Sequence, residues 1–400
     1  MRAPGLGRLR HQLPVYSPIP AAAVLGGLRA ALRPAPGLIE DIHDQLKTRF
    51  GARDVLLTDS GTTALRIAIV AAQTGPGPVA LPAYGCYDLA TAADGAGCRV
   101  ALYDVDAAVL GPDMNSLSAA LKSGAKVVVV AHLYGYPVDV PAIQRLCDAA
   151  GALVLEDAAQ GAGGTLAGRL LGSFGTVTML SFARGKGVTG GGGGALLAFD
   201  DGGAAVLSRA KSMLGAADRG WTRLAALAAQ WCLARPQIYG IPAGMPWLRL
   251  GETVYRTPGR PRHAPPATLG VLARTLPNPD RELAVRRKHA VRLTAAIAAS
   301  GAFTSMVPIP GADPGYLRLP AMCTGSRRPA SLLTSRLGVE AAYPKSLADL
   351  EGFKHRIEGV TSSFSGARAL AARLITVPTH GRLEERDLEA LETWLAAQAR

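Results

Sequence analysis

A lysine, an aspartate and a serine fall close together in the middle of the 400-residue chain. Asp157 follows an apolar run, Ser181 ends the next run, and Lys186 comes five residues after that serine. An amine bonds to a carbonyl carbon more readily when it is desolvated or lies near another cation, and Arg184 is two residues from this lysine. A buried carboxylate stabilises a neighbouring cationic group. These residue types indicate carbonyl chemistry through an amine.

A second set of residues is typical of an anion-binding turn. Ser60, Gly61 and Thr62 precede an apolar helical pattern that continues to about Ala72. A small-residue turn that opens a helix presents backbone N–H groups and the positive end of the helix dipole to an anion. The alternative is an ordinary N-cap, in which Ser60 or Thr62 satisfies the first turn. The motif alone leaves both a phosphate site and a plain cap open.

These side chains need elements that bring them to one place. Apolar runs alternate with helical patterns, which predicts βαβ units and a mainly parallel sheet in an α/β fold. Open sheets of this kind bind ligands beyond the carboxyl ends of their strands, where Asp157 and Ser181 fall. The predicted strands are 79–81, 99–103, 126–131, 152–155, 176–182 and 195–199, and predicted helices include 37–50 and 141–150.

Two further features lie near these strand ends. Tyr84 and Tyr87 follow the first strand and could form a flat wall for a ring to stack on, although turn tyrosines also serve simple packing. Five consecutive glycines, 190–194, stand between two predicted buried strands, where a flexible linker would be misplaced. We therefore expect the glycines to form a tight passage beside a bound ligand.

The length of the chain predicts two domains that share a cleft. We expect an extended N-terminal segment over residues 1–36, a large domain over 37–256 and a smaller C-terminal domain over 267–400, with a Pro- and Arg-rich connector between the domains. Residues 203–250 resemble an apolar helical insertion. A core or interface helix is the favoured interpretation, and contact with a membrane surface is the alternative, which lacks the expected dense basic face.

Charge and cysteine content restrict the partners and the compartment. The net charge is +13, which attracts anions of any kind, but the arginines are scattered and no nucleic-acid-reading motif accompanies them. We therefore expect small anionic substrates and no nucleic acid. The five cysteines form no C-x-x-C pair, so neither a disulfide framework nor a zinc site is indicated, and a cytoplasmic location is expected. No apolar run is typical of a membrane span.

Five segments together resemble the DegT/DnrJ/EryC1/StrS family of pyridoxal-phosphate-dependent aminotransferases, over roughly residues 35 to 200. The last two segments are specific only in combination. The resemblance implies a fold-type-I α/β transferase with a mainly parallel central sheet, helices on both faces and a smaller C-terminal α+β domain. It also implies the cofactor pyridoxal 5'-phosphate and a homodimer with sites at the subunit interface. The matching segments are 60–65, 82–87, 132–135, 156–160 and 181–186.

The resemblance also implies roles for individual residues. Lys186 would bond to the cofactor aldehyde and move protons during the reaction, and Asp157 would pair with the ring nitrogen. Gln160 would lie beside the ring. The family's ring-stacking aromatic falls near Cys86, so a neighbouring tyrosine would take over that contact. The other residues assigned to cofactor binding are Ser60, Gly61, Thr62 and Ser181 around the phosphate and Tyr84 and Tyr87 near the ring.

The chain departs from the family pattern at two places. After Gln160 the family usually has Ala-His-Gly-Ala, whereas residues 161–164 are Gly-Ala-Gly-Gly. The family also has an Asn-Tyr-Arg segment that reaches the partner subunit's cofactor phosphate, and the nearest match here, 254–256, is Val-Tyr-Arg. These losses put the standard nucleotide-linked substrate in doubt. Family members that dehydrate sugars have histidine in place of the lysine, so Lys186 argues against dehydration.

We expect an aminotransferase that moves an amino group from an amino-acid donor, glutamate by resemblance, to the ketone of a sugar in amino-sugar, polysaccharide or secondary-metabolite biosynthesis. A cyclitol ketone is a neighbouring alternative. An alternative of another class is a non-catalytic binding or assembly module in polysaccharide biosynthesis, which the lost asparagine and histidine favour. The retained Lys186 and Asp157 oppose it, because an unused site has no physical reason to keep both groups.

Overall fold

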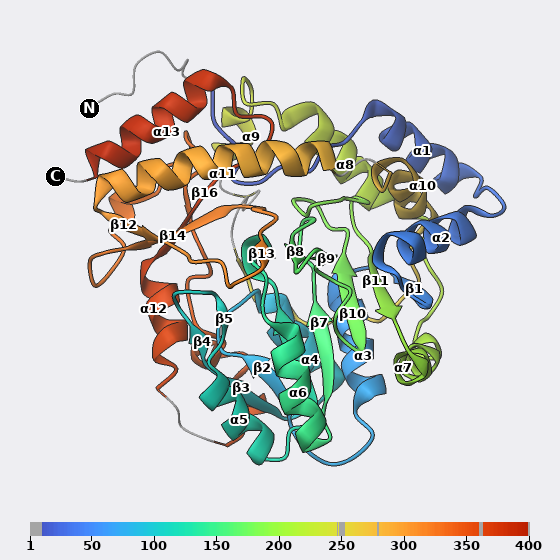
Figure 1. The fold of residues 1–400 in the computed structure, drawn as a ribbon. Helices are drawn as coiled ribbons and strands as arrows, with labels where there is room; N and C mark the ends of the chain where they lie inside the picture. Colours follow the sequence, from blue (N-terminus) through green and yellow to red (C-terminus); the bar gives the residue numbers. More distant parts are fainter. Residues whose placement is uncertain (1–9, 246, 248–252, 278–279, 360–362, 399–400) are drawn as a thin grey trace.

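A seven-stranded sheet forms the centre of the computed structural model, which describes residues 10–245, 247, 253–277, 280–359 and 363–398 (Figure 1). Its strand order is β1-β11-β10-β7-β6-β2-β3. Strands β10, β7, β6, β2 and β3 are mutually parallel, and β11 is antiparallel to β1 and β10. The predicted mainly parallel sheet is confirmed. The strands are β1 Asp54–Thr58, β2 Val79–Pro82, β3 Val100–Tyr103, β6 Val127–Ala131, β7 Leu153–Asp157, β10 Val177–Ser181 and β11 Gly194–Ala198.

Helices cover both faces of this sheet, because successive strand residues point to opposite sides. Leu196 of β11 packs in the cluster with helices α3, α4 and α7, whereas Leu197 packs with α2 and α10. Helices α5 and α6 extend the second layer over β2, β3 and β6. The bounds are α2 Leu38–Phe50, α3 Gly61–Ala72, α4 Tyr87–Ala96, α5 Met114–Lys122, α6 Val140–Ala150, α7 Asp201–Lys211 and α10 Pro266–Thr275.

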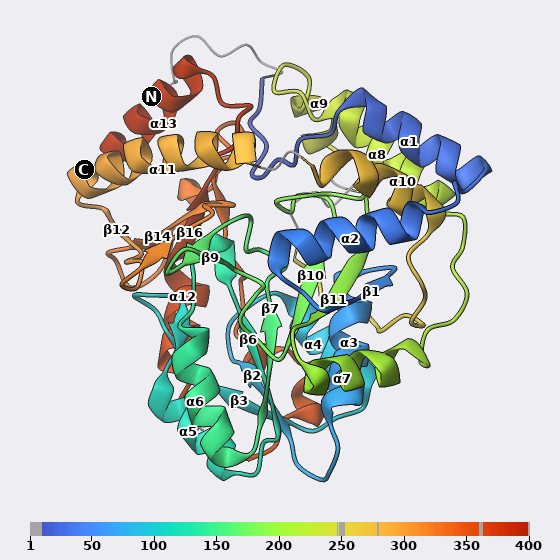
Figure 2. The ribbon, with the colours of Figure 1, turned by 45° about the vertical axis from the view of Figure 1, so that its right-hand side comes forward.

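A smaller antiparallel sheet, in the order β12-β14-β16-β15, lies beside the large one and packs against helices α11 and α13. Both ribbon views show these two helices side by side above that sheet (Figures 1 and 2). Helix α12 instead contributes to the core of the large sheet. The bounds are α11 Asp280–Ser300, α12 Ser365–Arg373, α13 Glu385–Ala397, β12 Phe303–Ser305, β14 Leu319–Cys323, β15 Glu340–Ala341 and β16 Leu374–Val377.

The N-terminal segment contains a helix that we did not expect. Residues 10–20 run without regular structure, and α1 then spans Ala21–Leu32. The expectation of an extended segment over 1–36 is therefore wrong for α1, because this stretch follows the last proline of the cluster and is rich in the strong helix formers Ala and Leu. Residues 1–9 lie outside the described part of the chain.

The 203–250 insertion contains helix α8 (Trp221–Leu233) and the short α9 (Gly240–Ala243). Leu224 and Leu227 of α8 are buried against α1 and α10, while Trp221 is 45% exposed. This burial accounts for the apolar pattern as packing. Residues 246 and 248–250 of the insertion are not among the described residues.

Helix α10 packs on the large sheet and against α1, although we expected the small domain to begin at residue 267. We propose a domain boundary between Thr275 and Asp280, because α11 is the first helix that packs on the small sheet.

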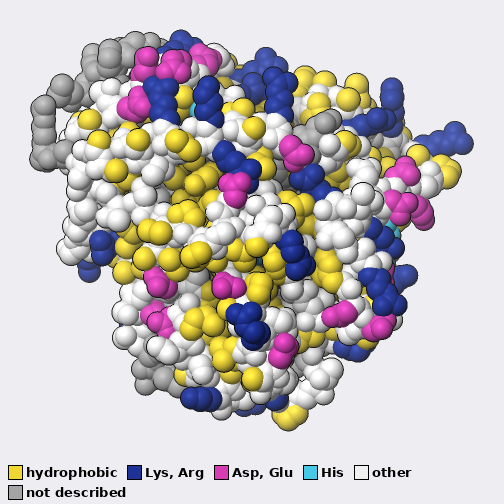
Figure 3. Space-filling model, viewed as in Figure 1, with side chains coloured by type: hydrophobic (Ala, Val, Ile, Leu, Met, Phe, Trp, Pro, Cys, Tyr) yellow, Lys and Arg dark blue, Asp and Glu magenta, His cyan; other side chains and the backbone are white. Residues whose placement is uncertain are grey.

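On the face drawn in Figure 3, basic side chains are spread over the molecule with acidic ones between them. None of the helices in the described part of the chain combines the length and apolar character that crossing a bilayer requires.

Residues 10–19, which we call the N-terminal strap, join the small sheet's helical layer to the lysine loop. Arg10 pairs with the buried Asp387 of α13 at 2.6 Å, and the Nε2 of His380 donates a hydrogen bond to the Leu13 carbonyl at 2.7 Å. The Ser17 hydroxyl donates to the carbonyl oxygen of Lys186 at 2.5 Å. The segment before the first helix thus contacts both parts of the molecule.

Candidate active site

The site lies at the carboxyl edge of the parallel strands, as the sequence predicts. Asp157 is the last residue of β7, and in the parallel register it stands opposite Ala131 of β6 and Met179 of β10. Ser181 ends β10, and Lys186 lies in the loop that follows. A lysine, a carboxylate and a hydroxyl therefore reach one sheet edge from two adjacent strands.

One pocket collects most of the predicted residues. Lys186 is partly buried, and the described residues include no hydrogen-bond partner of its amine. Cys86 and Asp88, at the start of α4, line the same pocket, as do His132 and Ala159. The predicted residues that line it are Ser60, Gly61, Thr62, Asp157, Gln160, Ser181 and Lys186.

Helix α3 begins at this pocket and directs its N-terminus into it. The Ser60 side chain caps the helix by accepting a hydrogen bond from the Thr63 amide at 3.1 Å, so the capping alternative is correct for this serine. The first turn still presents N–H groups that no intrahelical carbonyl satisfies. The cap and the anion site are therefore compatible.

Glycine is required at position 61 because β10 approaches the helix closely. A Cβ at Gly61 would lie 2.7 Å from the Ser181 Cβ and 2.9 Å from its hydroxyl oxygen. Gly194 of β11 stands opposite both Thr58 and Ser181, which brings the turn before α3 beside the end of β10. The helix N-terminus and the serine hydroxyl consequently share one small space.

Asp157 is a buried carboxylate with 8% of its surface exposed. Its Oδ1 accepts a hydrogen bond from the Ala159 amide at 2.9 Å. Burial raises the pKa of Asp157, and the amide and the charge of Lys186 lower it by less. A desolvated acid of this kind gains from a cationic partner placed in the pocket.

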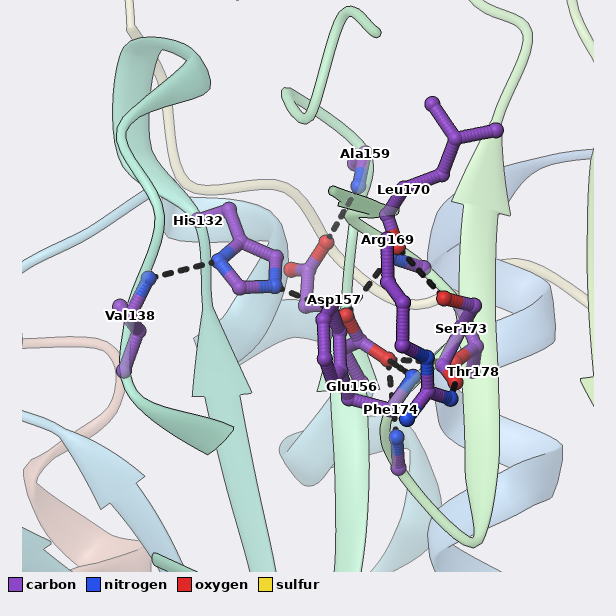
Figure 4. A network of polar contacts seen from close by, with 12 residues as sticks. His132, Val138, Glu156, Asp157, Ala159, Arg169, Leu170, Ser173, Phe174 and Thr178 are labelled. Atoms are coloured by element: carbon purple, nitrogen blue, oxygen red, sulfur yellow. Dashed lines mark hydrogen bonds and ion pairs between the residues drawn. The ribbon is translucent and has the colours of Figure 1, made fainter. Parts of the chain in front are cut away.

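Glu156, the residue before it, belongs to a separate network that sequence reasoning missed (Figure 4). Successive strand residues point to opposite faces, so Glu156 turns away from the pocket and is fully buried. It accepts hydrogen bonds at 2.6–2.9 Å from five donors. These are the amides of Gly172, Phe174 and Gly175, the Thr178 hydroxyl and Nε2 of His132. Burial by itself would raise the pKa of Glu156, but the bonds from His132 and the amides lower it.

His132 connects this network to the pocket that it lines. The Val138 amide donates to Nδ1 at 3.1 Å, so the ring hydrogen lies on Nε2 and points to Glu156. The signal available in the sequence was the placement of His132 just after one strand and Glu156 at the end of the next.

Gln160 is held by two partners from distant segments. Its Oε1 accepts from the Tyr134 amide at 3.0 Å, and its Nε2 donates to the Tyr343 hydroxyl at 2.6 Å. These two bonds orient the side-chain amide at the pocket wall. Tyr343, from the segment after β15, is a site residue that sequence reasoning missed.

The structure does not bring Tyr84 and Tyr87 to the pocket surface. Tyr84 is fully buried, and its hydroxyl accepts from the Tyr343 amide at 3.2 Å, while the Tyr87 hydroxyl accepts from the Lys345 amide at 2.9 Å. Both tyrosines hold the segment after β15. Cys86, between them in sequence, is the residue that lines the pocket, and burial raises the pKa of its thiol to about 12.

The glycine run lies behind the site. A Cβ at Gly190 would meet Thr268 and Leu272 of α10, and one at Gly191 would meet Leu227 of α8. The passage is tight, as expected, but it is tight against helices, and the run does not line the pocket. Gly194, at the end of the run, does approach Ser60 and Gly61 of the pocket wall, so the position beside a ligand stays a prediction.

Comparisons with known proteins agree with this arrangement. Residues 38–227 match the model of the DegT/DnrJ/EryC1/StrS aminotransferase family. The chain is 36% identical over 124 residues to the UDP-N-acetyl-3-dehydro-alpha-D-glucosamine 3-aminotransferase of Acidithiobacillus ferrooxidans, covering 31% of this chain and 34% of that protein. It is 31% identical over 154 residues to the 3-amino-5-hydroxybenzoate synthase of Amycolatopsis mediterranei, covering 38% and 40%.

The structural similarity extends over nearly the whole chain. The crystal structure of a 3-amino-5-hydroxybenzoic acid synthase superposes with a TM-score of 0.77 at 21% identity, covering 97% of this chain and 99% of that one. The sequence alignments span only about a third to two-fifths of the two curated relatives. At this identity the superposition establishes the fold alone.

Proposed function

We propose that the chain is a pyridoxal-phosphate-dependent aminotransferase of the DegT/DnrJ/EryC1/StrS family, whose model matches residues 38–227. It moves an amino group from an amino-acid donor, glutamate in our proposal, to the ketone of a sugar or related ring. The observation that carries the proposal is one pocket lined by Lys186, the buried Asp157 and Ser181 beside the N-terminus of α3.

The residues present fit pyridoxal phosphate. The close approach of Gly61 to Ser181 brings the Ser181 hydroxyl and the first-turn amides of α3 to the same wall of the pocket, where both could donate to a phosphate. Thr62 adds a hydroxyl at the same turn. Asp157 would hold a proton on the ring nitrogen, since a cation at that position would stabilise the charged form of this buried carboxylate.

Bound pyridoxal phosphate supplies an aldehyde and an electron-accepting ring. Lys186 would hold the cofactor through its amine, and that amine would also move a proton at the substrate α-carbon, first as general base and then as general acid. Asp157 would keep a proton on the ring nitrogen. Gln160, oriented by Tyr134 and Tyr343, forms part of the pocket wall and excludes water.

The acceptor that we propose is a cyclic ketone. One relative is named for a UDP-linked amino sugar and another for an aminated hydroxybenzoate, and further relatives are named for the cyclitol ketone 2-deoxy-scyllo-inosose. These names share a six-membered ring and an amino group, which supports a ring ketone and leaves a cyclitol as the neighbouring candidate to a sugar.

A non-catalytic module remains the second candidate, and one observation favours it. Tyr255, in the segment nearest to the family's partner-reaching motif, donates its hydroxyl to Asp94 at 2.7 Å and is thereby turned toward its own chain. Two features of the pocket oppose this candidate: a lysine amine that has no hydrogen-bond partner among the described residues, and a desolvated aspartate beside it.

We further propose a homodimer in the cytoplasm, with a small-molecule donor and acceptor as its other partners. The dimer follows from the family. The compartment follows from the five cysteines, all of which are free thiols.

Borohydride reduction of the purified protein incubated with pyridoxal phosphate tests the proposal. Peptide mass spectrometry should find the reduced cofactor attached at Lys186, and the Lys186→Ala variant should lack the adduct. Glutamate should be converted to 2-oxoglutarate in one equivalent per site before any acceptor is added. A protein that neither takes up the cofactor nor converts glutamate would exclude the enzyme and leave the binding module.

A further inference from the structure

A second cavity, of about 580 Å³, lies on the other side of the lysine loop. Ala183 lines both this cavity and the pocket that holds Lys186, so the two spaces adjoin. Its walls come from the N-terminal strap, the lysine loop, α8 and the segment before β14. Its size is within the usual range for sites that bind small molecules.

Most of the wall is apolar. The strap contributes Leu13, Pro14 and Val15, and α8 contributes Ala226, Ala229 and Leu233. An apolar wall offers few hydrogen-bond partners. It therefore suits the carbon skeleton of a compact ring better than a ligand face that carries hydroxyl groups.

Two arginines interrupt this apolar wall. Arg184 is exposed and makes no ion pair or hydrogen bond to the described residues. Arg318 donates to the Thr376 hydroxyl at 3.2 Å and lies 3.6 Å from Glu340, whose carboxylate is the acid nearest to it. Arg318 is thus paired with an acid, whereas Arg184 has no acidic partner among the described residues and leaves a positive charge at the cavity. Tyr239 adds a hydroxyl that stays neutral, since burial raises its pKa to about 12.

Arg318 also adjoins the residues that orient Gln160. Its charge acts on the buried hydroxyls of Tyr134 and Tyr343, and the Tyr343 hydroxyl accepts from Gln160 in the lysine pocket. The Tyr134 hydroxyl is buried with no hydrogen-bond partner in the described structure. A set of polar side chains therefore extends from the lysine pocket to Arg318 at the second cavity.

We propose that this cavity binds the acceptor and that Arg184 and Arg318 hold an anionic group on it, a carboxylate or a phosphate. The inference rests on the proposed function and specifies its substrate class as a ring ketone that carries a negative charge. The ring lies along the apolar wall, and the ketone reaches past Ala183 toward Lys186. A guanidinium pairs with either anion through two parallel hydrogen bonds.

The test measures the two half-reactions of the holoenzyme separately. Glutamate first converts the enzyme to its amine form, and the decay of that form is then followed with 3-oxocyclohexane-1-carboxylate and with the matching uncharged carboxamide. We expect the carboxylate to react at least tenfold faster at low concentration, since a hydrogen bond to a charged group contributes about one to two factors of ten. Equal rates for the two ketones would overturn the proposal.

Arg184→Gln is the decisive variant, because this exposed side chain makes no hydrogen bond or ion pair with the described residues and its loss should leave folding intact. It should lose most of the preference for the carboxylate, which is a ratio of two acceptor rates and does not depend on the rate of the glutamate step. Arg318→Gln should behave alike, and if it slows the glutamate step equally, Arg318 serves the donor and its assigned role is wrong. Arg260→Gln, on an exposed arginine outside the cavity, is the matched control.

Inhibition distinguishes the two anions. If the cavity binds a phosphate, uridine diphosphate should inhibit the acceptor half-reaction, and Arg184→Gln should weaken that inhibition. If a carboxylate is bound, cyclohexanecarboxylate should do so instead. Inhibition by neither probe would overturn the anion site. Loss of the glutamate half-reaction in the unmodified protein would instead refute the proposed function.

Discussion

At the scale of single residues, Glu156 and Asp157 show how two adjacent carboxylates acquire different tasks. The strand directs them to opposite faces of the sheet, and each has its own set of partners. Glu156 has five donors around it and a lowered pKa, whereas Asp157 has one amide and a raised pKa. The first carboxylate stabilises the loops behind the site, and the second is available to a bound group.

Asp157→Asn should abolish most of the catalysis and leave the fold in place. The amide can still accept from the Ala159 N–H, and replacing a desolvated carboxylate costs the folded state little. Because the variant cannot hold a proton on the ring nitrogen, we expect the glutamate half-reaction to slow by roughly 10²–10⁴-fold. Stopped-flow absorbance would measure this, with the free energy of unfolding as control. A rate within threefold of the parent would exclude the assigned role.

Glu156→Gln should instead destabilise the protein, by about 3–5 kcal/mol, because an amide group would place its own hydrogens against buried donors. The sign of the pH dependence follows from the lowered pKa. The carboxylate's contribution is present above its unfolded pKa and is lost as pH falls through the folded value. Urea unfolding across that acidic range measures both effects.

Asp113→Asn provides the matched control for this change. Asp113 caps α5 by accepting from the Ser116 amide at 2.8 Å, and asparagine is an equally good N-cap. The control should change the free energy of unfolding by less than about 0.5 kcal/mol. Equal effects of the two substitutions would contradict the importance of the Glu156 network.

At the scale of elements, the site depends on how closely α3 approaches β10. Gly61→Ala places a Cβ 2.7 Å from the Ser181 Cβ, and the helix and strand must separate to accommodate it. We expect a loss of about 1–3 kcal/mol of stability from overpacking and a weaker affinity for pyridoxal phosphate, since the anion donors move apart. Fluorescence titration with the cofactor, together with urea unfolding, measures both.

Gly75→Ala is the control for that substitution. A Cβ at Gly75 meets no atom within 4 Å, and its backbone is not in the left-handed region. Cofactor affinity should remain unchanged there. If Gly61→Ala bound the cofactor as tightly as this control, the phosphate would not lie at the start of α3.

At the scale of the whole molecule, the N-terminal strap connects the two parts of the protein through buried polar contacts. Its Arg10 pairs with Asp387 of α13, and its Leu13 carbonyl accepts from His380. Farther along, Ser17 contacts the backbone of Lys186. The strap thus contacts both the helical layer of the small sheet and the lysine loop.

His380 should make this connection sensitive to acid. Burial lowers its pKa to about 4 from an ordinary value of 6.5, so the unfolded chain binds a proton more readily than the folded one. Stability should therefore fall as pH decreases from about 6.5 toward 4, by up to about 3 kcal/mol from this residue. His380→Gln, which keeps a donor for Leu13, should show a shallower decline in urea unfolding between those values.

His263, whose side chain makes no hydrogen bond or ion pair with the described residues, is the appropriate control, and His263→Gln should retain the parent's slope. A parent and a His380→Gln variant with parallel pH profiles would contradict the assignment to His380.

The motif residues and the strands of the sheet could be predicted from local sequence patterns, because each depends on a short stretch of chain. Alternating apolar runs and helical periodicity lie within windows of 5 to 20 residues or so, and parallel strands carry their end residues to one edge. Asp157, Ser181 and Lys186 were therefore placed together correctly. Helix α1 was missed, because a cluster of prolines before it led us to treat the whole segment as extended.

The remaining parts of the site were decided by tertiary structure. Tyr343 meets Gln160 across 183 residues of chain, and Ser17 meets Lys186 across 169. No periodicity connects such positions, since their approach depends on how the small sheet and the strap pack onto the large sheet. The same packing put the glycine run beneath α8 and α10 and Arg318 beside the second cavity. Local sequence thus specified the reactive groups, and long-range packing specified their surroundings.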